Sequence, residues 1–268
     1  MSSTIIAVMG IPLLVLLALI GQHLVRKHVN SDGLEAHQGT GYAVLGLIGT
    51  LFSVLIGFMV VASLDNYHDA RQHVQVEANA LANIYRIAHG LSDPDRSRIR
   101  QLCRDYCNAV IDDEWAQMEN KQTSKSAWFR YEQLWDAAVS IKPHDDRESD
   151  LLQAILSGAY IFAENRRARV VQCEHGFLPP ALWVVIAFGA FITIAITCTL
   201  SGKWPEYQRV MIVFVSLSLG LNMWLLVVFN SPFSGMLKIS PDMFTLDRDV
   251  IFKDSDELPS YIKPTRKN

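Results

Sequence analysis

The chain has 268 residues, 50% of them apolar, and its formal net charge at pH 7 is −3. A nearly neutral chain lacks the basic surface that nucleic-acid recognition needs, so we expect no nucleic-acid partner. Its length and positive mean hydropathy of +0.17 suit one membrane domain and one modest soluble domain.

The first apolar segment runs from Thr4 to Val25 and is followed by a short basic run. A secretory signal peptide has a basic start and a small-residue cleavage site. This segment has neither feature, which indicates a retained first membrane span. A short polar loop that contains His37 leads to the second apolar segment.

The stretch Gly41–Gly90 organises the chain. It begins with about two dozen uncharged residues and continues, without a helix breaker, into a polar segment. A helix crosses the apolar core of a bilayer with ~20 residues at ~1.5 Å per residue. We therefore predict one helix that spans the membrane as far as Leu64 and then continues into water. Its small residues lie on one face of the helix, which favours close packing against another helix. They are Gly46, Gly49, Ser53 and Gly57.

Polar residues follow this second span. Asp69, His73 and Glu77 are spaced four apart, so we expect them on one side of the helix. Two carboxylates and an imidazole could hold a divalent ion. A solvated or inter-subunit polar face is the commoner use of such a stripe, and we predict no metal site.

The next part of the chain predicts further helices. Ser92-Asp93-Pro94 starts one that runs to about Glu119, and Ser124 or Ser126 starts another that ends before Pro143. A third begins near Asp145 to Ser149 and reaches the basic run Arg166, Arg167 and Arg169. No useful alternation of apolar and polar residues occurs, so we expect no strand.

The four cysteines form neither a CxxC pair nor a regular framework. The pattern therefore does not indicate a secreted protein held together by disulfides. A metal site at one helical turn's spacing would need two more ligands. We interpret all four cysteines as reduced thiols in the protein core: Cys103, Cys107, Cys173 and Cys198.

Two more apolar segments follow, Ala181–Leu200 and Val210–Phe229. The predicted fold is an all-α membrane protein with four transmembrane helices and a helical soluble domain inserted between the second and third spans. Its expected parts are a first transmembrane pair (1–64), the soluble domain (65–180), a second pair (181–229) and an extended C-terminal tail (230–268). Four spans place both termini and the soluble domain on one side. Basic residues near the span ends do not decide the orientation, but the free thiols favour a cytoplasmic domain.

The apolar cores of the four spans contain no Asp, Glu, Lys, Arg or His. Proton-coupled carriers usually need such a group near the midplane. The sequence also lacks a phosphate loop, a nucleophile elbow and a zinc-protease motif. We therefore expect no enzymatic activity and no cofactor.

Four segments in order resemble the DUF4239 family, a bacterial membrane family described as bestrophin-like: VEANALANIYRIAHGLSDPDRSRIR, YCNAVIDDEWAQM, LPPALW and SPFSGMLKISPDMF. The resemblance covers His37 to Phe244 and implies the bacterial inner membrane. Two positions depart from the family pattern. Asn230-Ser231 stands where the family usually has an acidic residue, and Ser63-Leu64 where it usually has a tryptophan.

The resemblance implies a pentameric ion channel whose second span lines a hydrophobic neck, as in bestrophins. Their neck helix contains a Gly-Phe pair, which Gly57-Phe58 resembles. Stepping back from Phe58 by single turns gives Val54 and Thr50 as further neck residues. A neighbouring stripe offers an alternative neck: Ile48, Leu55 and Met59.

Two functions from different classes follow. The first is an oligomeric bestrophin-like channel for small inorganic ions in the lipid bilayer. An acidic vestibule of Asp65, Asp69 and Glu77 would follow its neck and favour cations. The second is a membrane-anchored helical scaffold or sensor without a pore. A ring of four or more subunits favours the channel, and a monomer or dimer favours the scaffold.

Overall fold

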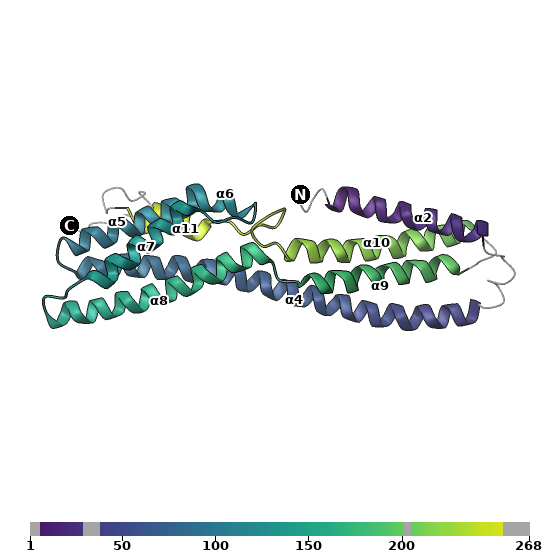
Figure 1. Ribbon diagram of the computed structural model, residues 1–268, viewed down its shortest axis with the longest axis horizontal. Helices are drawn as coiled ribbons and strands as arrows, with labels where there is room; N and C mark the ends of the chain where they lie inside the picture. Colours follow the sequence, from purple (N-terminus) through teal and green to yellow (C-terminus); the bar gives the residue numbers. More distant parts are fainter. Residues whose placement is uncertain (1–5, 29–37, 201–204, 254–268) are drawn as a thin grey trace, which may run out of the picture. The chain divides into compact units, whose positions relative to one another are not determined.

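The computed structural model describes residues 6–28, 38–200 and 205–253 (Figure 1). None of these residues lies in a strand, which confirms the predicted all-helical class for the described part of the chain. The chain forms two compact units. The apolar unit comprises Met1–Tyr67, Phe177–Ser231 and Gly235–Leu237, and the polar unit comprises His68–Gly176, Pro232–Ser234 and Lys238–Asn268. The loop residue His37 lies outside the described residues.

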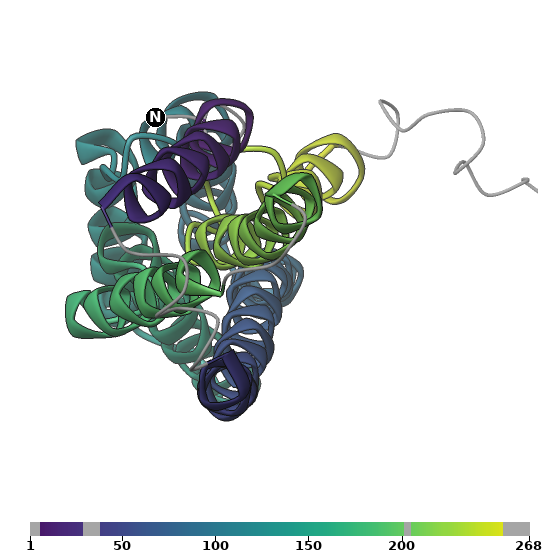
Figure 2. The same ribbon diagram turned by 90° about the vertical axis from the view of Figure 1, so that its right-hand side faces the viewer.

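The apolar unit consists of η1 (Ile6–Gly10), α2 (Ile11–His28), the first part of α4 (Gln38–Ile87), α9 (Pro180–Thr199) and α10 (Pro205–Phe229). All four α-helices are long and apolar enough to cross a membrane. They correspond to the four predicted spans, and α10 begins five residues before the predicted Val210. Within this unit α4 lies on the side of α9 and α10 that faces away from α2 (Figures 1 and 2).

One side of α4 holds this helix against its neighbours. Phe52 and Ile56 are buried in a core cluster with Ile186 and Ala190 of α9, Leu226 of α10 and Leu178, which precedes α9. A Cβ atom on Gly189 would lie 2.3 Å from Cε2 of Phe52, so the ring can approach α9 only at a glycine. The packing of α4 is therefore one-sided.

The polar unit contains the second part of α4, η2 (Ala88–Gly90), α5 (Asp95–Ala109), η3 (Val110–Glu114), α6 (Trp115–Met118), α7 (Lys125–Ser140) and α8 (Asp146–His175). Two predicted helix starts carry side-chain caps. Ser124 Oγ accepts a hydrogen bond from the backbone N–H of Ala127 at 3.1 Å. Asp145 Oδ1 accepts one from the backbone N–H of Glu148 at 2.6 Å.

Glu148 fixes the loop that precedes α5. Its Oε1 accepts hydrogen bonds from the hydroxyl of Ser92 and, at 2.8 Å, from the backbone N–H of Ser92. Its Oε2 accepts the backbone N–H of His144 at 3.0 Å. These bonds, first that of the Ser92 hydroxyl, lower the pKa of Glu148 to about 2 because they favour the ionised carboxylate.

The C-terminal segment differs from the expected extended tail. After α10 the chain forms α11 (Asp242–Leu246) and η4 (Asp247–Ile251). Phe244 is fully buried, and Trp115 donates its indole N–H to the carbonyl of Ile239 at 3.0 Å. The described part of the tail folds back because its apolar side chains find partners in the polar unit of the same chain. Residues 254–268 lie outside the described residues.

All four cysteines are free and buried, which confirms their interpretation as core thiols. The Cys107 thiol donates to the carbonyl of Phe244 at 3.2 Å. Burial raises the pKa of Cys107 to about 12 and that of Cys173 to about 11. Both remain thiols at neutral pH.

Candidate functional site

The side of α4 that faces away from α9 and α10 carries the three predicted neck residues. Thr50, Val54 and Phe58 are exposed in the protomer, Phe58 with 68% of its surface accessible and Val54 with 52%. Two residues of the alternative stripe, Leu55 and Met59, are partly buried against the core cluster of the apolar unit. A single protomer therefore leaves the first stripe available for contact and uses much of the second for its own packing.

This uncovered face of α4 mixes small and polar residues with large apolar ones, such as Leu47, Leu51 and Val61, each at least 57% exposed. A Cβ atom added to Gly46, Gly49 or Gly57 would meet no heavy atom within 4 Å among the described residues. These glycines therefore do not pack against another described helix of the same protomer. The close helix packing that their spacing predicts is not formed within one protomer. Thr50 donates its hydroxyl to the carbonyl of Gly46 at 2.7 Å, and Ser53 donates to Thr50 at 3.0 Å.

The exposed face of α9 lacks the uncovered glycines of α4. It presents large apolar side chains, among them Val184, Phe188 and Phe191, each at least 64% exposed. Such a face suits acyl chains, whereas small residues with hydroxyls are typical of contact with another helix or with water. Both uncovered faces of the apolar unit thus expose large apolar side chains, and the face of α4 adds uncovered glycines and the hydroxyls of Thr50 and Ser53.

Asp65 and Asp69 continue the same side of α4 beyond its apolar part. Both residues are exposed; Asp65 belongs to the apolar unit and Asp69 to the polar unit. Their spacing from Phe58 by seven and eleven residues keeps them on its side of the helix, because an α-helix has ~3.6 residues per turn.

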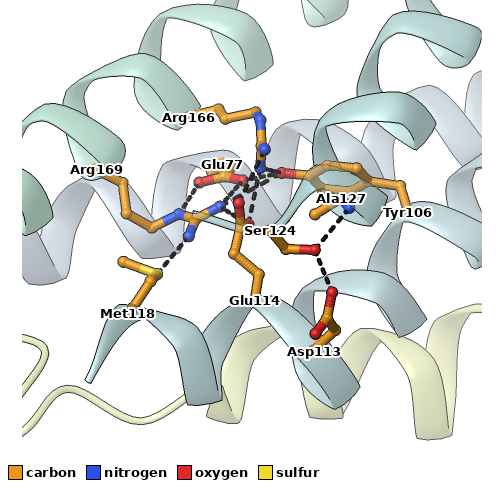
Figure 3. Close-up of polar contacts among 9 residues, drawn as sticks. All are labelled: Glu77, Tyr106, Asp113, Glu114, Met118, Ser124, Ala127, Arg166 and Arg169. Atoms are coloured by element: carbon orange, nitrogen blue, oxygen red, sulfur yellow. Dashed lines mark hydrogen bonds and ion pairs between the residues drawn. The ribbon is translucent and has the colours of Figure 1, made fainter. Parts of the chain in front are cut away.

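Glu77 requires a correction to the predicted acidic vestibule. It is fully buried and accepts hydrogen bonds from Arg169, at 2.6 Å from Nε and at 2.9 Å from Nη2, and from the hydroxyl of Tyr106 (Figure 3). The physical reason is helical rotation. A step of eight residues from Asp69 turns the side chain by ~80°, from the exposed side of α4 to the packed side.

Two members of the polar stripe Asp69, His73 and Glu77 have protein partners in the structure. His73 Nδ1 lies 2.9 Å from Oδ1 of Asn165, and Glu77 is engaged by Arg169. No group of three or more metal-ligating side chains occurs in the described ranges of the chain.

A second ion pair extends the buried contacts of Glu77. Arg166 binds Glu114 through Nη1 to Oε2 and Nη2 to Oε1, both at 2.9 Å (Figure 3). Arg169 Nη2 also lies 2.9 Å from Oε2 of Glu114, and Arg166 donates to the Tyr106 hydroxyl at 2.6 Å. We name these five residues the buried ion network.

The buried ion network is electrically balanced. Its two carboxylates offset two guanidinium groups, and it joins α4, α5, η3 and α8. Burial alone would raise the pKa of Glu114, but Arg169 and Arg166 outweigh burial and lower it. Burial likewise opposes the charge of Arg169, yet Glu77 and Glu114 keep its pKa well above the ordinary value. Glu114 therefore stays ionised and Arg169 stays protonated at neutral pH.

Sequence reasoning missed this network because Arg166 and Arg169 belong to a basic run next to a predicted span. A signal was nevertheless present in the sequence. Buried residues on α8 recur every three or four positions, at Ile155, Ala159 and Phe162, and the same spacing continues through Arg166 and Arg169. A helix face that stays on this period keeps facing the core.

Two polar residues after α10 have distinct roles. Asn230 Oδ1 accepts hydrogen bonds from the backbone N–H groups of Phe177 at 2.9 Å and Leu178 at 2.7 Å, so it fixes the entry into α9 with an oxygen acceptor.

Asp247 is buried, and its Oδ2 has no hydrogen-bond partner. Burial raises the pKa of Asp247 to about 7, although Arg86 offsets part of this effect.

Comparisons with solved structures show the same fold in a bacterial bestrophin homologue and in a second protein. A crystal structure of a bacterial bestrophin homologue from Klebsiella pneumoniae is 11% identical, covers 91% of this chain and 98% of its own, and has a TM-score of 0.68. A second crystal structure, of a protein named only as a membrane protein, is 12% identical, covers 90% and 96%, and has a TM-score of 0.66. At these identities the likeness shows the fold alone.

A search of curated proteins found no match. The model of the family described as "Bestrophin-like domain", in contrast, matches residues 13–244. This range is most of the chain and includes nearly all of α2, the other three apolar helices and His68–Gly176 of the polar unit. The chain therefore belongs to the bestrophin-like domain family.

Proposed function

We propose that this protein is an oligomeric ion channel of the bacterial inner membrane. In this proposal α2, the first part of α4, α9 and α10 of each subunit cross the bilayer, and the polar unit lies in the cytoplasm. Several copies, five by analogy with bestrophins, place the uncovered face of α4 around a common axis. Membership of the bestrophin-like family and the fold shared with a bacterial bestrophin homologue support this proposal.

The observation that carries the proposal is the chemistry of the uncovered face of α4. A Cβ atom on its glycines would meet no other described helix of the same protomer, and Phe58 stands exposed beside them. A neck of Thr50, Val54 and Phe58 would then constrict the axis. Apolar constrictions of this kind pass ions only when they are wetted.

The proposed selectivity is for cations. Asp65 and Asp69 are exposed on the side of α4 that carries Phe58. In a ring of subunits each residue would form a circle of carboxylates next to the neck, and such circles concentrate cations and repel anions. Glu77 has no part in this selectivity because Arg169 neutralises it inside the polar unit.

Ion flux in proteoliposomes tests the channel. We expect wild-type protein to conduct, and Phe58→Ala to increase the flux because the substitution widens and wets the constriction. Phe188→Ala on the outer face of α9 is the matched control, with a ring of similar exposure. If neither wild-type protein nor Phe58→Ala passes any of the common inorganic ions, the chain is instead a membrane-anchored scaffold or sensor.

Reversal potentials under a salt gradient test the selectivity separately. We expect cation permeation in the wild-type protein and a loss of this preference when Asp65→Asn is combined with Asp69→Asn. Clear chloride selectivity that is unchanged in the double variant would remove the basis of the proposal. Glu77→Gln should leave the reversal potential of the folded channel unchanged.

A further inference from the structure

A groove of about 1000 Å³ lies on the surface of the polar unit between α7 and α8. Its walls include four aromatic side chains, Trp128, Tyr131 and Trp135 of α7 and Tyr160 of α8. Trp128 is 52% exposed and Tyr160 is 69% exposed. Exposed apolar patches around a concavity are typical of binding sites. Nothing in the proposed channel function uses this groove.

Arg166 contributes to the lining of the same groove, although only 1% of its surface is exposed. Its guanidinium carbon lies 5.7 Å from the ring centre of Trp128 and 5.6 Å from that of Tyr131. The side chain thus lies between the groove and the buried ion network. Its two terminal nitrogens are engaged by Glu114 and Tyr106 on the network side.

The Nε atom of Arg166 is buried and has no hydrogen-bond partner. A guanidinium carries ~5 N–H donors in a rigid planar fork, and a buried charged donor without an acceptor is costly. Figure 3 shows Nε on the side of the guanidinium away from the carboxylates of the network. Because the terminal nitrogens hold the network, the Nε edge is the part of Arg166 that can still bind an acceptor.

The chemistry of this edge selects the ligand. The Nη2 nitrogen carries a second N–H besides the one that binds Glu114. This second N–H lies parallel to Nε–H, and the two together match the two oxygens of a carboxylate. The groove is also lined by one further cation, Arg167, and by two acids, Glu132 and Glu164. Two exposed carboxylates beside the opening disfavour an anion with several charges. The aromatic walls favour an apolar or aromatic body.

We propose that the groove between α7 and α8 binds a small organic monocarboxylate. Its carboxylate accepts hydrogen bonds from the Nε edge of Arg166, and its apolar body packs against the rings of Trp128, Tyr131 and Tyr160. The site lies wholly within the polar unit. The proposal does not depend on whether the protein conducts ions.

Isothermal titration of the full-length protein in detergent tests the site, with benzoate and hexanoate as probes. We expect saturable binding of at least one probe. Benzamide should bind about 10- to 100-fold more weakly than benzoate, because it has no negative charge and offers Arg166 one acceptor oxygen where the carboxylate offers two. Failure of both probes to bind, or equal binding of benzamide and benzoate, would overturn the proposal.

Variants at the groove make the test specific. Trp128→Ala and Tyr160→Ala should each weaken benzoate about three- to tenfold. Phe129→Ala is the matched control, because Phe129 is 57% exposed and lies next to Trp128 but does not line the groove. Glu164→Gln should strengthen benzoate about twofold at low salt, since it removes a repelling charge.

Two outcomes of these variants contradict the proposal. If the groove variants bind benzoate as tightly as Phe129→Ala, the ligand binds elsewhere. If benzoate does not bind and Trp128→Ala and Tyr160→Ala instead reduce the size of the oligomer, the groove is a contact between subunits. Size-exclusion chromatography with light scattering distinguishes this case from a ligand site.

Discussion

Replacing Glu77 by glutamine tests the buried ion network. Glutamine keeps the size of the side chain but removes its charge, so the four charges of the network no longer cancel. It also turns an N–H₂ group or a weaker acceptor toward the guanidinium of Arg169, whose Nε lies 2.6 Å from the carboxylate. Both groups of this pair are fully buried, so water cannot replace the lost contact.

The expected cost follows from the remaining partners. Breaking a buried ion pair by neutralising one member typically costs about 3–5 kcal/mol, because the other charge stays buried. Glu114 still lies 2.9 Å from Nη2 of Arg169 and offsets part of the loss. We therefore expect the free energy of unfolding to fall by about 3 kcal/mol, which lowers Tm by about 10 °C for a domain of this size.

Thermal unfolding in detergent, recorded at one heating rate, measures this effect. The control is Asp105→Asn, which disrupts a partly exposed ion pair with Arg130 at 3.7 Å. Such a pair is worth at most about 1 kcal/mol. A Tm of Glu77→Gln as close to wild type as that of Asp105→Asn would refute the reasoning.

A double variant separates charge balance from general damage. Glu77→Gln combined with Arg169→Gln leaves Glu114 and Arg166 as a neutral pair with two hydrogen bonds of 2.9 Å. We expect the double variant to lose less stability than the sum of its single variants, by about 0.5–3 kcal/mol. Strict additivity would show that the two side chains contribute independently.

Three further predictions concern pH and packing. The pKa of Asp247, raised by burial to about 7, means that the folded state keeps a proton that the unfolded state loses, so wild type loses stability as pH rises from about 4 to about 7. Asp247→Asn should remove this loss and increase the free energy of unfolding at pH 8 by an amount on the order of 2 kcal/mol once solvent screening is included, with a higher Tm at pH 8 but not at pH 4; Tm values at pH 8 equal to wild type would contradict it. Glu148, with its pKa lowered to about 2 by hydrogen bonds, contributes stability that is lost as pH falls from about 4.5 to about 2. Glu148→Gln should therefore flatten acid unfolding in this range, and an unchanged acid profile would show that the capping bonds do not matter. Gly189→Ala should cost about 1–3 kcal/mol because its Cβ would lie 2.3 Å from Phe52, whereas Gly57→Ala should leave the protomer's stability unchanged; similar Tm values for both variants would argue against the close approach.

Much of the helical layout could be predicted from local signals. Ser124 and Asp145 cap the helices that they were expected to start, and an unbroken α4 follows from the absence of proline and glycine in its polar part. The four apolar helices follow from length and composition. These features depend on neighbouring residues in the sequence, which is why sequence patterns capture them.

Contacts between distant segments could not be predicted in the same way. Glu77 and Arg169 are separated by 92 positions, and their pairing depends on how α8 packs against α4. The extended-tail interpretation failed for a related reason. Phe244 is buried against residues that lie more than a hundred positions earlier, such as Tyr106 and Trp115, and polar neighbours in the sequence conceal this contact.

Thiol accessibility at Phe58 tests the central claim most directly. The native cysteines are all buried, so Phe58→Cys introduces the single exposed thiol among the described residues. We predict that a small hydrophilic thiol reagent modifies Phe58→Cys in proteoliposomes and changes the ion flux, whereas Phe188→Cys on the outer face of α9 stays unmodified in lipid. If Phe58→Cys is as unreactive as Phe188→Cys, the uncovered face of α4 meets acyl chains and does not line a pore.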